Sequence, residues 1–177
     1  MSPAARTVAI ASWAMLGVLG LLGEAVVRLS RVAIAGIQRG LSAPEWAVLL
    51  AASAAMAYVE GYRAFSLSFG PRVVARSFEI GRAPTVMHVV LAPLYAMSLL
   101  GDGRGRVVRS WMLLAGIALL IVLVRSLPPT WRSIADAAVA LSLSWGFVFI
   151  GVLWARRAWR ELAAMPQRPR SAPQRNT

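Results

Sequence analysis

The sequence predicts an all-α integral membrane protein, a polytopic helical bundle of about five transmembrane helices. Apolar residues make up 58% of the 177-residue chain, and its mean hydropathy is +0.64, whereas a soluble domain is about 45–50% apolar. Five runs contain no charged residue: 7–23, 46–59, 83–101, 110–124 and 137–155. A helix needs roughly 17–25 residues to cross a bilayer, so three runs are long enough and the second and fourth need their polar neighbours as well.

The beginnings and ends of the first two helices follow from local signals. The first run contains no proline and continues into an amphipathic stretch, so we expect one helix that reaches about Gln38 and stops at Arg39-Gly40. The N-terminal stretch resembles a signal peptide, but charged residues stand where the cleavage region would be, which favours an uncleaved helix. Ser42 and Glu45 have the spacing of a capping box at the start of the second helix.

Prolines and short polar links divide the remainder of the chain. Gly70-Pro71 is expected to end the second helix, followed by a short amphipathic helix at the membrane interface over 72–79. Pro93 should kink the third helix. The segment after Pro166 has almost nothing to bury. We therefore predict a single transmembrane domain over residues 1–165 and a disordered, basic cytoplasmic tail over 166–177.

The number of crossings depends on the third run. Five crossings divide the arginines twelve to seven between the two sides, and the positive-inside rule then places the N-terminus outside and the C-terminus in the cytoplasm. The alternative has four crossings and a re-entrant third segment, which divides the arginines fourteen to five and puts both termini in the cytoplasm. Charge favours four crossings. We adopt five, because 85–100 is long and apolar and a re-entrant segment needs protein around it.

The composition excludes several kinds of site. All 19 basic residues are Arg, so there is no lysine for a Schiff base or a P-loop. With no Cys and a single His, His88, one chain cannot supply a thiolate metal site, an iron–sulfur cluster or a multi-histidine metal box. Motifs such as Gly-x-Ser-x-Gly and His-Glu-x-x-His are absent. We expect no cofactor, no metal and no catalytic residue.

The net charge of +12 lies in the links between apolar runs and in the tail. Positive charge in those places orients a membrane protein, so the predicted partner of the arginines is the lipid bilayer and not nucleic acid. Together with the apolar runs, this predicts a multi-pass protein of a bacterial cytoplasmic (inner) membrane.

Five ionisable residues are predicted to meet at one polar end of the bundle. Ionisable groups at membrane depth are costly and tend to face the bundle interior or a wet cavity, so such a cluster is a candidate site. The two that lie three apart on one helix can also pair with each other. Each member has a structural alternative, namely an interfacial ion pair, an interfacial histidine, a snorkelling arginine or a helix cap. The five residues are Glu60, Arg63, His88, Arg125 and Asp136.

Small residues recur at every fourth position on the second and fifth helices. Such rows allow two helices to approach closely in lipid. The alternative is that an Ala-rich span only reflects GC-rich codon usage. The packing residues that we select are Ala47, Ala51 and Ala55, then Ala57 and Gly61, and on the fifth helix Ala138, Ser142 and Gly146.

These observations predict a protein that works by helix association, either as an accessory or assembly subunit of a membrane complex or as a homo-oligomer. Its expected partners are therefore other membrane subunits or further copies of itself. The alternative is a small ion- or proton-coupled transporter or channel that uses Glu60 or Asp136, with Pro93 as a flexible break. A third possibility is a lipid-modifying membrane enzyme with His88 and Asp136 as acid and base.

Overall fold

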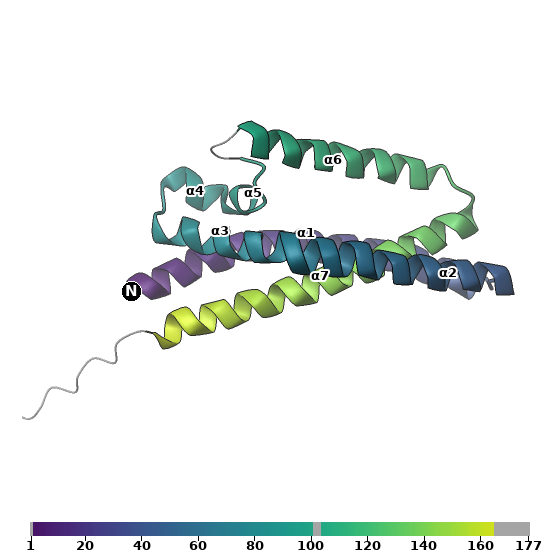
Figure 1. Ribbon diagram of the computed structural model, residues 1–177, viewed down its shortest axis with the longest axis horizontal. Helices are drawn as coiled ribbons and strands as arrows, with labels where there is room; N and C mark the ends of the chain where they lie inside the picture. Colours follow the sequence, from purple (N-terminus) through teal and green to yellow (C-terminus); the bar gives the residue numbers. More distant parts are fainter. Residues whose placement is uncertain (1, 101–103, 165–177) are drawn as a thin grey trace, which may run out of the picture.

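The computed structural model describes residues 2–100 and 104–164 of the chain. Over these residues the chain is all-helical (Figure 1), as the sequence predicts. The predicted tail over 166–177 lies outside the described residues. The helices in chain order are α1 (Pro3–Gln38), α2 (Ala43–Met56), the π-helix η1 (Ala57–Phe69), α3 (Gly70–Arg82), α4 (Val86–Val90), α5 (Ala92–Ala96), α6 (Arg104–Arg125) and α7 (Pro129–Ala163).

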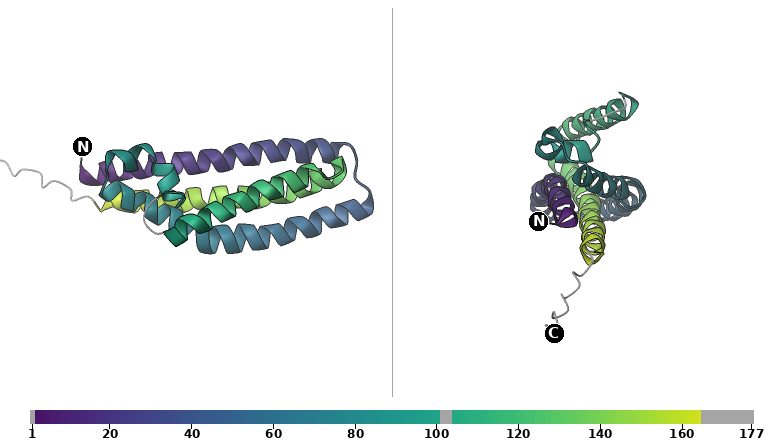
Figure 2. Two further views of the ribbon diagram at one scale, coloured as in Figure 1. Left: turned by 90° about the horizontal axis from the view of Figure 1, so that it is seen from above. Right: turned by 90° about the vertical axis from the view of Figure 1, so that its left-hand side faces the viewer.

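Four long helical rods run along the molecule in alternating directions (Figures 1 and 2): α1, the combined α2–η1–α3, α6 and α7. We call the end at which α1 begins and α7 finishes the terminal end, and the opposite end the far end. Thr7 of α1 bonds to Gly81 of α3 at the terminal end, and Gly36 of α1 lies against Ser133 of α7 at the far end. Both described chain ends therefore lie on the same side of the bundle.

Helix α1 matches its predicted bounds because both ends carry clear signals. The side chain of Ser2 caps its start by accepting a hydrogen bond from the N–H of Ala5 at 3.2 Å. Gly40 follows its last residues with a φ of +89°, a left-handed conformation that glycine adopts readily. The helix crosses the whole length of the bundle as one unbroken rod (Figure 2).

The predicted stop at Gly70-Pro71 is wrong, because α2, η1 and α3 form one continuous rod. In an α-helix, the ring of a proline clashes with the carbonyl four residues earlier. Here the π-helix widens the turn ahead of Pro71, and the N–H of Gly70 bonds to the carbonyl of Phe65, five residues back. The predicted interface helix, α3, is consequently packed on α1, with Val73, Val74 and Phe78 buried.

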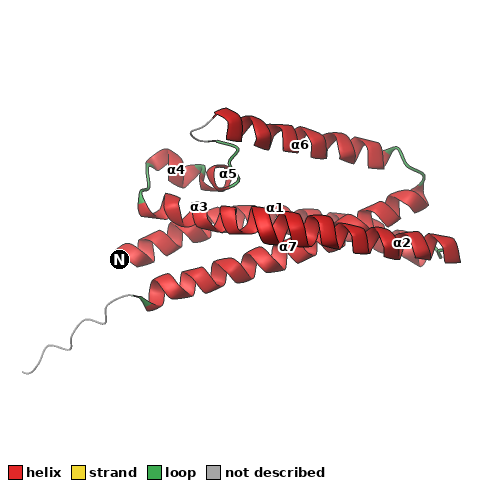
Figure 3. Ribbon diagram, in the orientation of Figure 1, coloured by secondary structure: helices red, strands yellow, loops and turns green. Residues whose placement is uncertain are grey.

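The third apolar run does not form a helix of membrane-crossing length. It forms two five-residue helices, α4 and α5, joined by a turn at Leu91 (Figure 3). Pro93 opens the second of them, so this proline separates two helices instead of kinking one. Arg76 of α3 donates a hydrogen bond to Ser98, which holds the end of this segment against the rod at the terminal end. The four-crossing alternative likewise does not require this segment to form a crossing helix.

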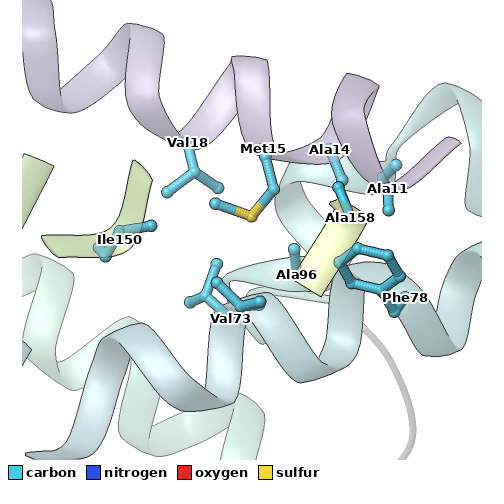
Figure 4. Close-up of a cluster of buried hydrophobic side chains, with 11 residues drawn as sticks. Ala11, Ala14, Met15, Val18, Val73, Phe78, Ala96, Ile150 and Ala158 are labelled. Atoms are coloured by element: carbon cyan, nitrogen blue, oxygen red, sulfur yellow. The ribbon is translucent and has the colours of Figure 1, made fainter. Parts of the chain in front are cut away.

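The core lies at the terminal half of the bundle, where α1, α3, α5 and α7 meet (Figure 4). The facing helices carry alanines there, and these small side chains let the helix backbones lie close together. A few large side chains then fill the space that remains between the helices. Met15, Val18, Phe78 and Ile150 are the main fillers, and each is at most 1% exposed. The core therefore fixes how α3 and the broken segment sit on the two long helices.

The outer surface is strongly apolar. Helices α1 and α7 are each long and apolar enough to cross a membrane. Large apolar side chains point outward from α2, α6 and α7 in particular, including Leu50, Trp111, Leu119 and Val148. Within the described residues α6 has few contacts, mainly with α7, and it stands apart from the other rods (Figure 1).

Candidate functional site

The structure does not bring the five predicted site residues together. His88 is on α4 at the terminal end, beside a groove that includes Ile10 of α1. Asp136 is near the start of α7 at the far end, one turn from Ser133, which lies against Gly36 of α1. At a rise of 1.5 Å per residue, Ile10 and Gly36 are about 39 Å apart along α1. The proposed acid–base pair of His88 and Asp136 is therefore not assembled within one chain.

Glu60 lies midway along the bundle and not at its end. It is on η1, and its carboxylate oxygen Oε2 lies 2.9 Å from the hydroxyl of Ser142 on α7. Ser142 has no exposed surface. One turn further along α7, Phe147 lies against Gly23, near the middle of α1. Glu60 is thus a carboxyl group at mid-bundle depth that is tied across a helix interface.

A second polar contact lies beside the first. The indole N–H of Trp145 on α7 donates to the hydroxyl of Ser66 on η1 at 3.0 Å, and this hydroxyl donates to the carbonyl of Gly61 at 3.2 Å. Ser66 is buried. The separation of five residues between Ser66 and Gly61 matches the hydrogen-bond spacing of a π-helix. The sequence pointed to Ser142 and Gly61 only as packing residues, and it gave no signal for Ser66 or Trp145.

Arg63 does not pair with Glu60 among the described residues. The ion pairs there are Arg82–Glu161 and Arg132–Asp136. Arg63 is exposed on the outside of η1. The wider turn of a π-helix changes which residues share a face, so a spacing of three no longer aligns two side chains as it does in an α-helix.

Asp136 is part of a small charged group at the far end. Its carboxylate lies 3.7 Å from the guanidinium of Arg132, four residues earlier, and the charge of Arg125 at the end of α6 also acts on it. The expected cap is wrong: α7 begins at Pro129, ahead of Ser133, and Ser133 bonds to the carbonyl of Thr130. Arg125 and Asp136 are the two predicted site residues that do lie near each other.

His88 contacts an aromatic ring. Its ring meets that of Tyr95 edge-on, with 4.7 Å between the ring centroids. Its backbone N–H bonds to Thr85, which caps α4. The described residues contain no cluster of three His, Asp or Glu side chains that could hold a metal ion.

The predicted small-residue rows differ in their use. Gly61 lies against the ring of Trp145, and Gly146 lies against Phe65, so these glycines bring η1 and α7 together. Ser142 is buried in the same interface, where it contacts Glu60. Ala138 is also buried, at 2% exposure, and Ala57 is half-buried. The remaining row faces outward; its members are Ala47, Ala51 and Ala55.

The terminal end holds a basic groove that the sequence did not reveal. It has a volume of about 520 Å³ and lies between the end of α7 and the rod of α3. Arg156, Arg157 and Arg160 line it beside apolar side chains. Because the sequence predicted an interfacial helix over 72–79, it did not place α3 next to the end of α7.

Comparisons of the chain with protein-family models, with curated proteins and with solved structures found no match.

Proposed function

We propose that the protein is a small multi-pass membrane protein that works through helix association, as an accessory or assembly subunit or as a homo-oligomer. The observation that supports this best is the outward-facing row of Ala47, Ala51 and Ala55 on α2. Small residues at every fourth position are enriched where membrane helices touch, because they let backbones approach closely. Against lipid alone, these small side chains offer little surface for packing.

The same chain provides the internal comparison for this row. The other two small-residue rows contain Gly61 and Gly146. Each of these glycines accommodates a large aromatic side chain of the facing helix. Helix α2 has only Leu49 buried among its 14 residues. Helix α6 is similarly uncovered. Helix α2 packs on α7 along one side and leaves the side with the alanine row uncovered, and we propose that a helix of another subunit or another copy packs on the α2 row.

Cysteine cross-linking tests this proposal directly, because the chain has no cysteine of its own. We expect Ala51→Cys to form disulfide-linked or bifunctionally cross-linked species in native membranes. A dimer of the chain indicates self-association, and a heavier adduct of defined mass indicates a different subunit. Ala51→Leu should reduce the same complex, because the added side chain separates the two backbones.

The matched control is Leu50→Cys, whose parent side chain is 64% exposed on the same helix but points about 100° away from the row. Equal cross-linking from the two positions indicates random collision in the bilayer and rejects the proposal. Unchanged association of the Ala51→Leu variant, with the fold intact, also rejects it.

A second candidate function, proton-coupled transport, is favoured by the hydrogen bonds of Glu60. The hydroxyl of Ser142 lies 2.9 Å from Glu60 Oε2 and 2.9 Å from the carbonyl oxygen of Val139. A hydroxyl has one proton, and a carbonyl can only accept. The hydroxyl of Ser142 can therefore donate to only one of these two oxygens at a time. An ionisable group at mid-bundle depth that is held by one hydroxyl is a candidate for binding an ion or a proton.

Proton flux into proteoliposomes tests this second candidate. We expect Glu60→Gln to reduce the flux and Asp136→Asn, at the far end, to leave it unchanged. Unchanged proton flux in proteoliposomes of Glu60→Gln rejects transport.

A further inference from the structure

The basic groove at the terminal end combines a charged wall with an apolar floor. Its wall consists of Arg156, Arg157 and Arg160 of α7. Its floor is formed by Pro71 and Val74 of α3, together with Leu153 of α7. A ligand that fits both surfaces has an anionic group joined to a hydrocarbon chain.

None of the three arginines has a carboxylate partner among the described residues. Arg157 lies over the ring of Phe78, with its guanidinium carbon 5.3 Å from the ring centroid. Glu161, the acidic residue of the groove, is paired with Arg82 of α3. Arg156 and Arg160 are four residues apart on α7 and therefore point in nearly the same direction. The groove thus has a net positive charge that the protein around it does not neutralise.

The position of the groove on the molecule fits a lipid headgroup. The groove is lined by residues near the end of α7. That end of α7 lies at the same end of the bundle as the start of α1 (Figure 2). This inference depends on the chain spanning a membrane, as proposed above, but not on helix association. Four crossings put fourteen of the arginines on that side, which the positive-inside rule makes the cytoplasmic one. Anionic phospholipids are concentrated there, and basic pockets between helices on that side bind their headgroups.

We propose that this groove binds an anionic phospholipid. The phosphate group contacts Arg156 and Arg160, and one acyl chain lies along Pro71, Val74 and Leu153. The planar guanidinium group donates in a fork geometry that suits phosphate oxygens, whereas a zwitterionic headgroup brings its own cation to the same place. The groove should therefore prefer phosphatidylglycerol to phosphatidylcholine.

The test measures retention of phosphatidylglycerol by native mass spectrometry of the full chain, released from mixed vesicles of phosphatidylglycerol and phosphatidylcholine. The double variant Arg156→Gln/Arg160→Gln should bind phosphatidylglycerol at least about tenfold more weakly, because each charge-assisted hydrogen bond to the phosphate is lost. The matched control is Arg28→Gln/Arg31→Gln, which removes the same charge from exposed positions on α1. This control should retain the lipid as the unchanged protein does.

Competition distinguishes a lipid from a free anion. Neither inorganic phosphate nor glycerophosphoglycerol, which has the same headgroup without acyl chains, should displace the bound lipid at equal concentration. Displacement by either molecule shows that the site recognises a soluble anion and overturns the proposal. An equal loss of lipid from both double variants also overturns it, because general surface charge then accounts for the binding. Cross-linking at Ala51 is a separate measurement, so either proposal can fail alone.

Discussion

At the scale of single residues, glycines decide how closely the rods of this protein approach. A Cβ atom on Gly36 would overlap the side chain of Ser133, where α1 and α7 meet at the far end. Gly20 lies on the same helix, and a Cβ atom there would meet nothing within 4 Å. One glycine is therefore required by a helix contact, and the other is not.

This difference predicts opposite effects of the same substitution. Gly36→Ala should destabilise the protein by about 1–3 kcal/mol, because the added methyl group forces the two helices apart. Gly20→Ala should be neutral or stabilising by up to about 1 kcal/mol, because alanine restricts the unfolded chain and favours a helix. Unfolding in detergent with increasing denaturant measures both variants. Equal stability of the two variants contradicts the close contact at Gly36.

The capping box at the start of α2 is the residue-level feature that the sequence predicted best. The hydroxyl and the backbone N–H of Ser42 both donate to Glu45 Oε2, each at 2.7 Å. These two bonds stabilise the ionised carboxylate, the hydroxyl bond more than the backbone bond, and so lower the pKa of Glu45 below the ordinary value of 4.5 for a glutamate side chain. The cap therefore contributes fully above pH 4.5 and is lost as the pH falls through the lower, folded-state value.

Carboxyl NMR titration of Glu45 tests this prediction. In the unchanged protein the group should titrate below pH 4.5. In Ser42→Ala the pKa should rise toward 4.5 without reaching it, because the backbone N–H of residue 42 still donates. Ser126→Ala, which removes a serine hydroxyl on the link between α6 and α7, is the control and should leave the titration unchanged. The same pKa in all three proteins excludes the capping bond.

At the scale of elements, the π-helix η1 has the largest consequence. It carries the chain through Pro71 without a break, so α3 continues the rod and its apolar face reaches α1 and α7. It also places Glu60 opposite Ser142, whereas Arg63 is exposed. The predicted interface helix and the predicted Glu60–Arg63 pair were wrong for this one reason.

The packing of α3 can be measured at Phe78, which has no exposed surface. Phe78→Ala should destabilise the fold by about 3–5 kcal/mol, because it leaves a cavity among α1, α3 and α7 and removes the ring beneath Arg157. A helix lying on the membrane surface would lose little. Val86→Ala on α4, where the side chain is 81% exposed, is the control and should change stability by less than about 0.5 kcal/mol. Denaturant unfolding of the two variants distinguishes these outcomes.

At the scale of the whole molecule, the broken third segment controls the topology. Helices α4 and α5 stay beside the start of α1, so the chain turns back at the terminal end without running the length of the bundle. The next rod, α6, then runs to the far end. Because the four rods alternate in direction, both described chain ends lie on the same side of the bundle. The four-crossing alternative, which divides the arginines fourteen to five, also places both termini on one side.

Single cysteines can test this topology in intact cells or sealed vesicles. Ser2→Cys and Ala164→Cys should react with an impermeant maleimide from one side, and Ser42→Cys and Leu127→Cys from the other. The expected separation follows from the positions of these residues at the ends of the rods. Labelling of residues 2 and 164 from opposite sides indicates a fifth crossing and contradicts the four-rod arrangement.

The amino-acid sequence by itself determined the all-helical fold class and the positions of several helix ends. Apolar runs, a capping box at Ser42 and a glycine at position 40 are local signals, and the helices begin or end at these places in the structure. The small rows at Gly61 and Gly146 were also recognisable, because their spacing is local to one helix.

Only the tertiary structure decided which polar groups meet. Glu60 and Ser142 are 82 residues apart, and Arg82 and Glu161 are 79 apart, so no spacing along one helix relates them. Their approach depends on the π-helix that precedes Pro71 and on the break between α4 and α5 beside Pro93. Each of these features changes the direction or the depth of the helices that follow it. A proline restricts the backbone in both places, but its neighbours across the bundle determine whether the helix widens or breaks. The positions of the two candidate sites, at Glu60 and in the basic groove, therefore depend on the two prolines. Pro71 lies within a continuous rod, and Pro93 lies where the third segment breaks into two helices.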